Sequence, residues 1–283
     1  MPSNINQIAK ELLEAGKVKV IVGYAEGSIS GRAQTFIARV PEEAAKFVFN
    51  KYCSNNLVVY LTKSYKLPKP VGIFVKPCDT KAVIALMQEK QIKREDVYLI
   101  GLPCEGVSNS TSGELAGRCK VCQSHNPQFC DVIAGEAVNE TSVQVNPFAR
   151  LTEFESKTAE ERWDFWMQEF DKCVRCYACR QACPLCYCEQ CIVDKTQPRW
   201  IESSAHELGN MSWHLIRAFH LAGRCIGCGE CERVCHQNIP LGLLNMKMGK
   251  EIFELYGYRA GSDAEAKPPL VDFRMEDNQD FIR

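Results

Sequence analysis

Short apolar runs alternate with helix-like segments along the first half of the chain. Ile5, Ile8 and Leu12 recur at the spacing of one helical face, and Gly16 follows as a stop signal. Apolar runs between polar or glycine-rich turns are typical of buried strands. We therefore expect strands at residues 18–23, 35–40, 57–61, 71–75 and 97–101, and helices at 41–52 and 80–90, the latter with Asp79 as its N-cap.

This order of elements predicts an α/β domain with a mainly parallel sheet over residues 1–147. Sheets of this kind bind ligands beyond the carboxyl ends of their strands. Cys78 and Cys104 both follow such ends, so we expect them to face one crevice. Gly101 and Pro103 lie at the same edge and mark the place where a flavin could bind.

The second half of the chain has a different pattern. Residues 148–170 predict a helical connector between domains, with one helix over 152–171. Residues 171–260 are rich in cysteine and predict a mostly α-helical domain. The polar, proline-bearing residues 261–283 predict an extended tail. Its apolar residues suggest a contact with a partner, and they are Leu270, Val271, Phe273, Phe281 and Ile282.

Composition and charge narrow the class of protein. The chain has 283 residues, of which 46% are hydrophobic, and this is enough for two packed domains. A formal net charge of −1 gives no reason to expect nucleic acid as a partner. No apolar run approaches the roughly 18–20 residues of a membrane helix, and residues 1–5 lack the basic and apolar regions of a secretory signal. We expect a cytoplasmic protein whose 17 cysteines stay reduced and act as metal ligands.

Two four-cysteine runs repeat the C-x2-C-x2-C-x3-C spacing of bacterial dicluster ferredoxins. In such proteins three cysteines of one run bind one 4Fe–4S cluster, and the fourth reaches the other cluster. Zinc favours paired C-x2-C knuckles, so two complete copies of the longer spacing favour iron and sulfide. Crossed ligation predicts Cys173, Cys176, Cys179 and Cys235 as ligands of cluster 1, and Cys225, Cys228, Cys231 and Cys183 as ligands of cluster 2.

Three cysteines between the runs exceed what two clusters require. Cys186, Cys188 and Cys191 could bind an additional metal or supply a replacement ligand. They could equally be buried free thiols beside the clusters. His236 follows the second run where Pro184 follows the first, so it is either a residue that tunes a cluster by hydrogen bonding or a solvated loop histidine.

A looser group of five cysteines in the first half could bind a third cluster. Cys119, Cys122 and Cys130 follow Cys78 and Cys104 along the chain. We expect Cys104, Cys119 and Cys122 as ligands, with Cys78 or Cys130 as the fourth. The alternative is a zinc knuckle with Cys78 and Cys104 as structural residues. At a helix N-terminus, the Cys78 thiol would have a lowered pKa and could be reactive.

Residues 10–135 resemble the β-subunit family of coenzyme F420-reducing hydrogenase and formate dehydrogenase. The segments that carry this resemblance are residues 12–18 and 41–43, Lys76-Pro77-Cys78-Asp79, Gly101-Leu102-Pro103-Cys104 and Cys119-Lys120-Val121-Cys122. The cysteine-rich half, with about 40 residues between its runs, resembles the α-helical ferredoxin domain of heterodisulfide reductase and succinate dehydrogenase iron–sulfur subunits. The resemblance implies FAD and 4Fe–4S clusters that connect a flavin-reacting carrier to a partner enzyme.

Three functions are compatible with these features. The leading hypothesis is an iron–sulfur electron-transfer subunit of an anaerobic oxidoreductase of the formate dehydrogenase, hydrogenase or heterodisulfide reductase type. The first alternative is an FAD-containing diaphorase-type subunit that reduces or oxidises F420 or NAD(P). The second is a metal-bearing adaptor without redox activity. The sequence shows no acid–base or nucleophile constellation, so we expect no catalytic residue of its own.

The cluster assignment can be tested with one substitution. Replacing Cys176 by Ala removes a predicted ligand of cluster 1, so one cluster's electron paramagnetic resonance signal should disappear. An unchanged spectrum would contradict the ligand assignment.

Overall fold

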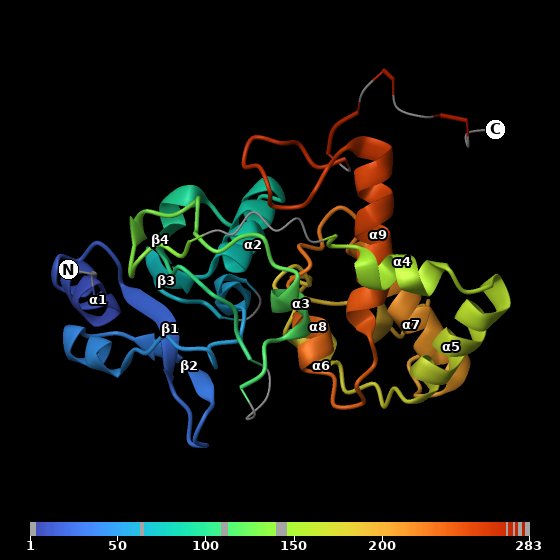
Figure 1. Ribbon diagram of the computed structural model, residues 1–283, viewed down its shortest axis with the longest axis horizontal. Coiled ribbons are helices and arrows are strands. Elements are labelled where there is room, and N and C mark those ends of the chain that lie inside the picture. Colours follow the sequence, from blue (N-terminus) through green and yellow to red (C-terminus); the bar gives the residue numbers. More distant parts are fainter. Residues whose placement is uncertain are drawn as a thin grey trace.

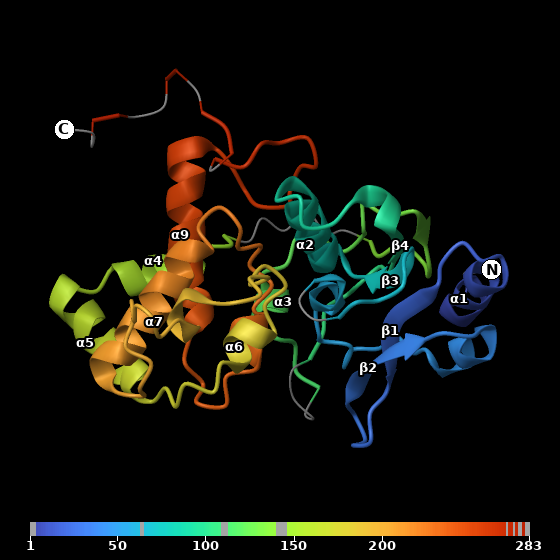
Figure 2. The same cartoon turned by 180° about the vertical axis from the view of Figure 1, so that it is seen from behind.

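A sheet with its covering helices lies at one end of the molecule and a helical region at the other (Figures 1 and 2). The structure is a computed structural model and describes residues 4–62, 65–108, 113–139, 146–269, 271–273, 275–276 and 279–280. Helices α2 (Pro77–Gln88), α3 (Gly117–Lys120) and α8 (Glu230–Arg233) lie between the two ends. Leu270, Phe281 and Ile282, which we expected in a partner contact, lie outside the described residues.

The sheet has five strands in the order β2-β1-β3-β4-β5. Only the pairing of β1 with β2 is antiparallel, and the other three pairings are parallel. The mainly parallel sheet that the sequence predicted is therefore confirmed. The strands are β1 (Val20–Glu26), β2 (Ala33–Ala38), β3 (Val71–Val75), β4 (Val97–Gly101) and β5 (Val132–Ile133).

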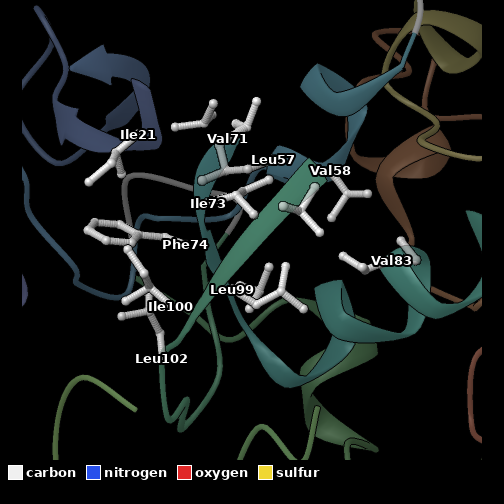
Figure 3. Packing of buried hydrophobic residues seen from close by; sticks show 14 of the residues in the cluster. Ile21, Leu57, Val58, Val71, Ile73, Phe74, Val83, Leu99, Ile100 and Leu102 are labelled. Carbon is white, nitrogen blue, oxygen red and sulfur yellow. The ribbon is translucent and has the colours of Figure 1, made fainter. Parts of the chain in front are cut away.

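Apolar side chains from alternate strand positions fill both faces of the sheet. Ile73 pairs with Leu99 in the β3–β4 register, and both side chains are buried. Figure 3 shows Val83 of α2 and Val58 beside this pair. On the opposite face Phe74 meets Phe47, with ring centroids 4.8 Å apart. This packing fixes α2 against the strands whose carboxyl ends lead to Cys78 and Cys104.

Two expected elements in the first half are wrong. Residues 57–61 form a 3-10 helix, η2 (Leu57–Leu61), and not a strand. The Asn56 side chain accepts the N–H of Val58 at 3.1 Å and so starts a helical turn, which a run of apolar residues does not reveal. The helix expected at 41–52 is the shorter 3-10 helix η1 (Pro41–Lys46), because the chain turns extended at Phe47 to bury its ring.

Helix α2 begins three residues earlier than the sequence predicted. Lys76 is the N-cap and Pro77 is the first helical residue, so Asp79 occupies the third helical position and is not the N-cap. The carboxylate of Asp79 accepts the backbone N–H of Lys76 at 3.1 Å, which satisfies an N–H group that the helix leaves unpaired. Cys78 therefore lies within the first turn of α2.

The helical region contains two helices where one was expected at 152–171. The first ends at Glu155 with Ser156 as its C-cap, and Thr158 caps the second. The Thr158 hydroxyl and the Glu161 carboxylate each accept a hydrogen bond from the other residue's backbone N–H group. The remaining helices of the described part of the chain are α1 (Ile5–Glu14), α4 (Ala149–Glu155), α5 (Ala159–Asp171), α6 (Ala178–Gln181), α7 (Glu207–His220), α9 (Leu241–Tyr256), η3 (Arg94–Asp96) and η4 (Ile192–Asp194).

The two halves of the chain are in direct contact. Cys183, Leu185 and Leu221 from the cysteine-rich half pack into the hydrophobic core that surrounds the sheet. The segment after α9 crosses α2, where Gln88 Nε2 donates to the carbonyl oxygens of Asp263 and Ala266 at 3.0 and 2.6 Å. The first part of the expected tail thus packs on its own chain. The proposed domain boundaries at residues 147, 170 and 260 stay a prediction.

A buried ion pair stands where β3 leads into α2. Lys76 Nζ lies 2.8 Å from Asp79 Oδ2, and both side chains are 1% exposed. The ammonium also donates to the Tyr24 hydroxyl and, at 2.9 Å, to the carbonyl oxygen of Asn55. Although burial opposes it, the charge of Asp79 holds the pKa of Lys76 well above its ordinary value. The positive charge is therefore retained inside the core.

This pair predicts a large and specific loss of stability. Replacing Asp79 by Ala leaves the buried ammonium uncompensated, which should lower the free energy of unfolding by about 3–5 kcal/mol. Urea denaturation followed by far-ultraviolet circular dichroism measures the loss. The control Glu14→Ala breaks a pair whose side chains are both 52% exposed, and it should cost less than about 1 kcal/mol. Equal midpoints for the two variants would contradict the prediction.

Candidate metal centres

The four cysteines expected around cluster 1 line a single cavity. The cavity is small, with a volume of about 20 Å³, is partly open to solvent and is also lined by side chains of α7 and of the turn before α9. Its cysteine lining consists of Cys173, Cys176, Cys179 and Cys235. The structure thus brings together residues from both four-cysteine runs in the crossed pattern that the spacing predicted.

Burial dominates the chemistry of these thiols. It raises the pKa of Cys179 to about 11, with the charge of Arg217 opposing the rise and the neighbouring thiols of Cys231, Cys173 and Cys235 adding to it. A thiol in such a place stays protonated unless a metal takes up its charge, because binding to iron displaces the proton. The arrangement therefore suits metal ligands.

Several buried polar atoms around this cavity have no partner in the described residues. His214 lines the cavity, and neither of its ring nitrogens makes a hydrogen bond. Its ring stacks on Phe170 at 4.9 Å, and burial together with Arg217 and Arg175 lowers its pKa to about 3. Nε and Nη1 of Arg175 are also unpaired. Unmade hydrogen bonds of buried groups are costly, and donors of this kind fit the sulfur atoms of an iron–sulfur cluster.

The four cysteines expected around cluster 2 form a second group. Burial raises the pKa of Cys225 to about 12, and the nearby thiols of Cys231 and Cys183 raise it further. The pKa of Cys228 is also raised by burial, then by Glu230 and Cys183. Each member therefore lies close enough to Cys183, from the other run, to interact with its charge. This is again the crossed pattern.

Asn245 of α9 faces the second group. Its Nδ2 donates to the sulfur of Cys231 at 3.5 Å, while its Oδ1 has no partner among the described residues. Hydrogen bonds to ligand sulfur atoms tune the reduction potential of a cluster. Asn245 is 4% exposed, so this bond is shielded from water.

Arg217 of α7 lies between the two groups. Its side chain is buried, and Nη2 donates to the carbonyl oxygen of Cys179 at 3.1 Å. Although burial opposes it, the thiols of Cys231 and Cys183, followed by those of Cys186 and Cys179, hold the pKa of Arg217 well above its ordinary value. The charge of this one buried cation therefore interacts with expected ligands of both clusters.

The cysteines of the α/β half divide into two sets. Cys78 and Cys104 follow strands whose last residues, Val75 and Gly101, are paired in the sheet. Burial raises the pKa of Cys104, and the thiol of Cys119 raises it further. Cys119 therefore lies close enough to Cys104 to belong to the same group. We call Cys78, Cys104 and Cys119 the third-site group.

The pKa expected for Cys78 is wrong in direction. Burial raises it strongly, followed by the charge of Asp79, and this outweighs the favourable position in the first turn of α2. A helix N-terminus can lower the pKa of a thiol, but here the Cys78 sulfur is largely shielded and lies 3.8 Å from the Asp79 carboxylate. The free thiol of Cys78 is therefore not a reactive nucleophile at neutral pH.

Cys122 and Cys130 make contacts elsewhere. Cys122 Sγ donates to the carbonyl oxygen of Ser124 at 3.3 Å, and Cys130 Sγ lies 3.8 Å from the carbonyl oxygen of Pro127. A Cβ atom on Gly101 would meet Pro127 at 2.7 Å and Cys130 at 2.8 Å, so these two side chains fill the space over Gly101. The flavin site expected near Gly101 and Pro103 stays a prediction.

The surplus cysteines differ from one another in their surroundings. Cys188 is exposed, whereas Cys186 is half-buried and lies close enough to Arg217 to raise its pKa. The Cys191 sulfur accepts a hydrogen bond from Arg180, which also pairs with Asp194 at 2.6 Å. His236 Nδ1 lies 3.8 Å from the sulfur of Cys176, so it stands beside cluster 1. Whether any of these residues binds a metal stays open.

No disulfide joins the 17 cysteines, all of which belong to the described part of the chain. Within the same residues, no three His, Cys, Asp or Glu side chains converge closely enough to hold a single metal ion. A tetrahedral zinc site draws its sulfur atoms to within about 3.8 Å of one another, given Zn–S bonds of about 2.3 Å. A 4Fe–4S cluster spaces its ligands more widely, because each thiolate binds a different iron.

Two residues near these sites were missed by the sequence analysis. Cys53 is fully buried beside the third-site group, and the only sequence signal was its place in the polar segment Cys53-Ser54-Asn55-Asn56 between two apolar stretches. Arg118 of α3 pairs with the buried Glu230 of α8 at 3.3 Å. Its position directly before Cys119 was visible in the sequence, but its partner is more than a hundred residues away.

The chain is similar in sequence to subunits of F420-dependent redox enzymes. The chain is 23% identical to the F420-dependent formate dehydrogenase subunit beta of Methanocaldococcus jannaschii, over 95% of this chain and 93% of that protein. It is 22% identical to the F420-dependent formate dehydrogenase 1 subunit beta of Methanococcus maripaludis, over 94% and 92% of the two chains. The predicted resemblance to this β-subunit family is confirmed, and it extends through the cysteine-rich half.

Other comparisons add less. No family model matches the chain. A solved structure of the F420-reducing NiFe hydrogenase complex from Methanosarcina barkeri, derivatised with xenon, contains a chain that matches with 21% identity. The match covers 38% of this chain and 40% of that one, with a TM-score of 0.30. Among the described residues, no helix is both long and apolar enough to cross a membrane.

The position of Arg217 predicts an electrostatic effect on two clusters at once. Reduction adds negative charge to a cluster, and a buried cation stabilises that charge. Arg217→Met should therefore shift both ferredoxin-type clusters to more negative potentials by tens of millivolts in a redox titration followed by electron paramagnetic resonance. Arg217→Lys, which keeps the charge, should shift them less. Unchanged potentials in Arg217→Met would contradict this placement.

Proposed function

We propose that this chain is the iron–sulfur electron-transfer subunit of a multisubunit oxidoreductase of the formate dehydrogenase type. The observation that carries the proposal is a series of three thiol groups with an arginine between each neighbouring pair. Arg118 lies between the third-site group and the cluster 2 group, and Arg217 lies between the groups of clusters 2 and 1. When bound there, 4Fe–4S clusters would supply one-electron transfer.

The place of Arg118 supports contact between the first two groups. Its side chain is 15% exposed and lies on α3, which stands beside α8 in Figure 1. Although burial opposes it, Glu230 and then the thiols of Cys78, Cys228 and Cys119 raise the pKa of Arg118. The guanidinium therefore interacts with ligands of the third site and of cluster 2 together. Such proximity favours electron transfer between them.

The residues of the chain would have three tasks in this role. The thiols hold the clusters, the buried arginines favour the reduced and more negative state, and the apolar surroundings exclude water. The third site would form the entrance of the series because it lies at the carboxyl edge of the parallel sheet, where such folds bind ligands. Cluster 1 would form the exit, since its cavity opens to solvent.

The partner is proposed from the relatives. Both curated relatives are named as beta subunits of F420-dependent formate dehydrogenases, and this chain aligns with more than nine-tenths of each. We propose a catalytic formate-oxidising subunit as the partner of this chain, with hydrogenase and heterodisulfide reductase complexes as related assemblies. The same names favour a second candidate function, a flavin-containing subunit that reacts with F420 itself.

Elemental analysis of the protein purified without oxygen distinguishes these functions. The electron-transfer function, which we call the relay, predicts about twelve irons and twelve sulfides per chain with little zinc. If only the two ferredoxin-type clusters are present, it predicts about eight irons and eight sulfides. One FAD per chain would favour the F420-reacting function. Zinc as the dominant metal would refute the relay and favour a structural adaptor. Reduction with dithionite should bleach the visible absorption of the iron–sulfur protein and leave the absorption of a zinc-bearing adaptor unchanged.

A further inference from the structure

The loop that carries Cys53 is bonded to each segment that carries a member of the third-site group. Three carbonyl oxygens of this loop accept hydrogen bonds from residues close in sequence to Cys119, Cys78 and Cys104. The bonds are Arg118 Nη2 to Ser54 at 3.0 Å, Lys76 Nζ to Asn55 at 2.9 Å and the Ser108 N–H to Lys51 at 2.6 Å. Cys53 therefore stands where these three segments meet.

The sulfur of Cys53 has the same kind of contact as the sulfurs of the group. The backbone N–H of Asn50 donates to Cys53 Sγ at 3.4 Å. Backbone N–H groups donate to the sulfurs of Cys104 and Cys119 at the same distance. Amide donors of this kind stabilise the negative charge of a thiolate bound to iron. The sulfur of Cys53 thus accepts a backbone N–H hydrogen bond that suits a ligand thiolate, as do the sulfurs of Cys104 and Cys119.

Charge and an unpaired amide support the same placement. Burial raises the pKa of Cys53 to about 11, while Lys76 lowers it and the thiol of Cys104 raises it, so the two sulfurs lie close enough to interact. Asn56 is 3% exposed, and its Nδ2 has no partner in the described part of the chain. A buried amide donor without a partner, three residues from Cys53, is suited to a sulfide of a cluster.

We propose that Cys53 is a ligand of a third 4Fe–4S cluster, together with Cys78, Cys104 and Cys119. Each thiol loses its proton to solvent when it binds iron. In this set Cys53 takes the place that the sequence gave to Cys122 or Cys130, because its thiol interacts with that of Cys104, whereas Cys130 packs with Pro127 over Gly101. The inference rests on the proposed function, because it needs a third cluster to exist.

The test compares single substitutions in the full-length chain, reconstituted with iron and sulfide without oxygen. Cys53→Ala should lose about four of about twelve irons and one set of paramagnetic resonance signals, and Cys104→Ala should lose the same set. Cys122→Ala and Cys130→Ala should keep all of the iron. Val58→Ala is the matched control, because it also removes atoms from a fully buried position of the same core and should keep all of the iron.

The outcomes separate the inference from the function. Full iron in Cys53→Ala, with loss in Cys122→Ala or Cys130→Ala, overturns the inference and leaves the relay intact. About eight irons in the unmodified chain refute the third cluster, and the inference with it. If Cys53→Ala also loses the signals of clusters 1 and 2, the paramagnetic resonance spectrum of Cys53→Ser, which nearly preserves side-chain volume, decides in its place. A changed signal of the third cluster in that variant supports ligation, and an unchanged signal overturns it.

Discussion

Balancing the charge of buried thiolates is the constraint on which this structure depends. The chain holds most of its cysteine sulfurs partly or fully shielded from water, where a thiolate without a counter-charge is unstable. Burial accordingly raises the pKa of Cys78, Cys179 and Cys225, and metal binding is the chemistry that removes such protons. The protein adds fixed positive charge beside each group, through Lys76, Arg118 and Arg217.

Two of the buried cations have carboxylate partners of their own. Lys76 pairs with Asp79, and Arg118 pairs with Glu230, which in turn binds Arg233 at 2.8 Å. Isolated buried charges are unfavourable, but each of these is also hydrogen-bonded. The Lys76 ammonium also bonds Tyr24 of β1, and the Arg118–Glu230 pair joins α3 to α8. The charges beside the sites therefore also hold the two halves of the chain together. This explains why expected ligands of different sites lie close to the contact between the two halves of the chain.

The sequence was most informative where the chemistry is local. The two four-cysteine runs carry their ligand pattern within a few residues, and Cys78 and Cys104 could be placed from the strands before them. Cys53 and Arg118 could not be placed in this way. The loop of Cys53 is bonded to Lys76 through Asn55, and Arg118 pairs with Glu230, so both depend on partners that are distant in the chain. The 3-10 helix at Leu57–Leu61 was missed for a different reason. A short apolar run is equally compatible with a buried strand, and only the Asn56 cap distinguishes the two.

The same contrast bears on how the sites assemble. Each ferredoxin-type run presents three ligands from one short loop, so little chain entropy is lost when they meet. The proposed third site draws its four ligands from four segments between Cys53 and Cys119, and these meet only after β3 and β4 have paired and α2 has packed. Metal binding at such a site is coupled to the folding of the whole α/β half. The third site is therefore the one whose occupancy should follow the stability of the sheet most closely.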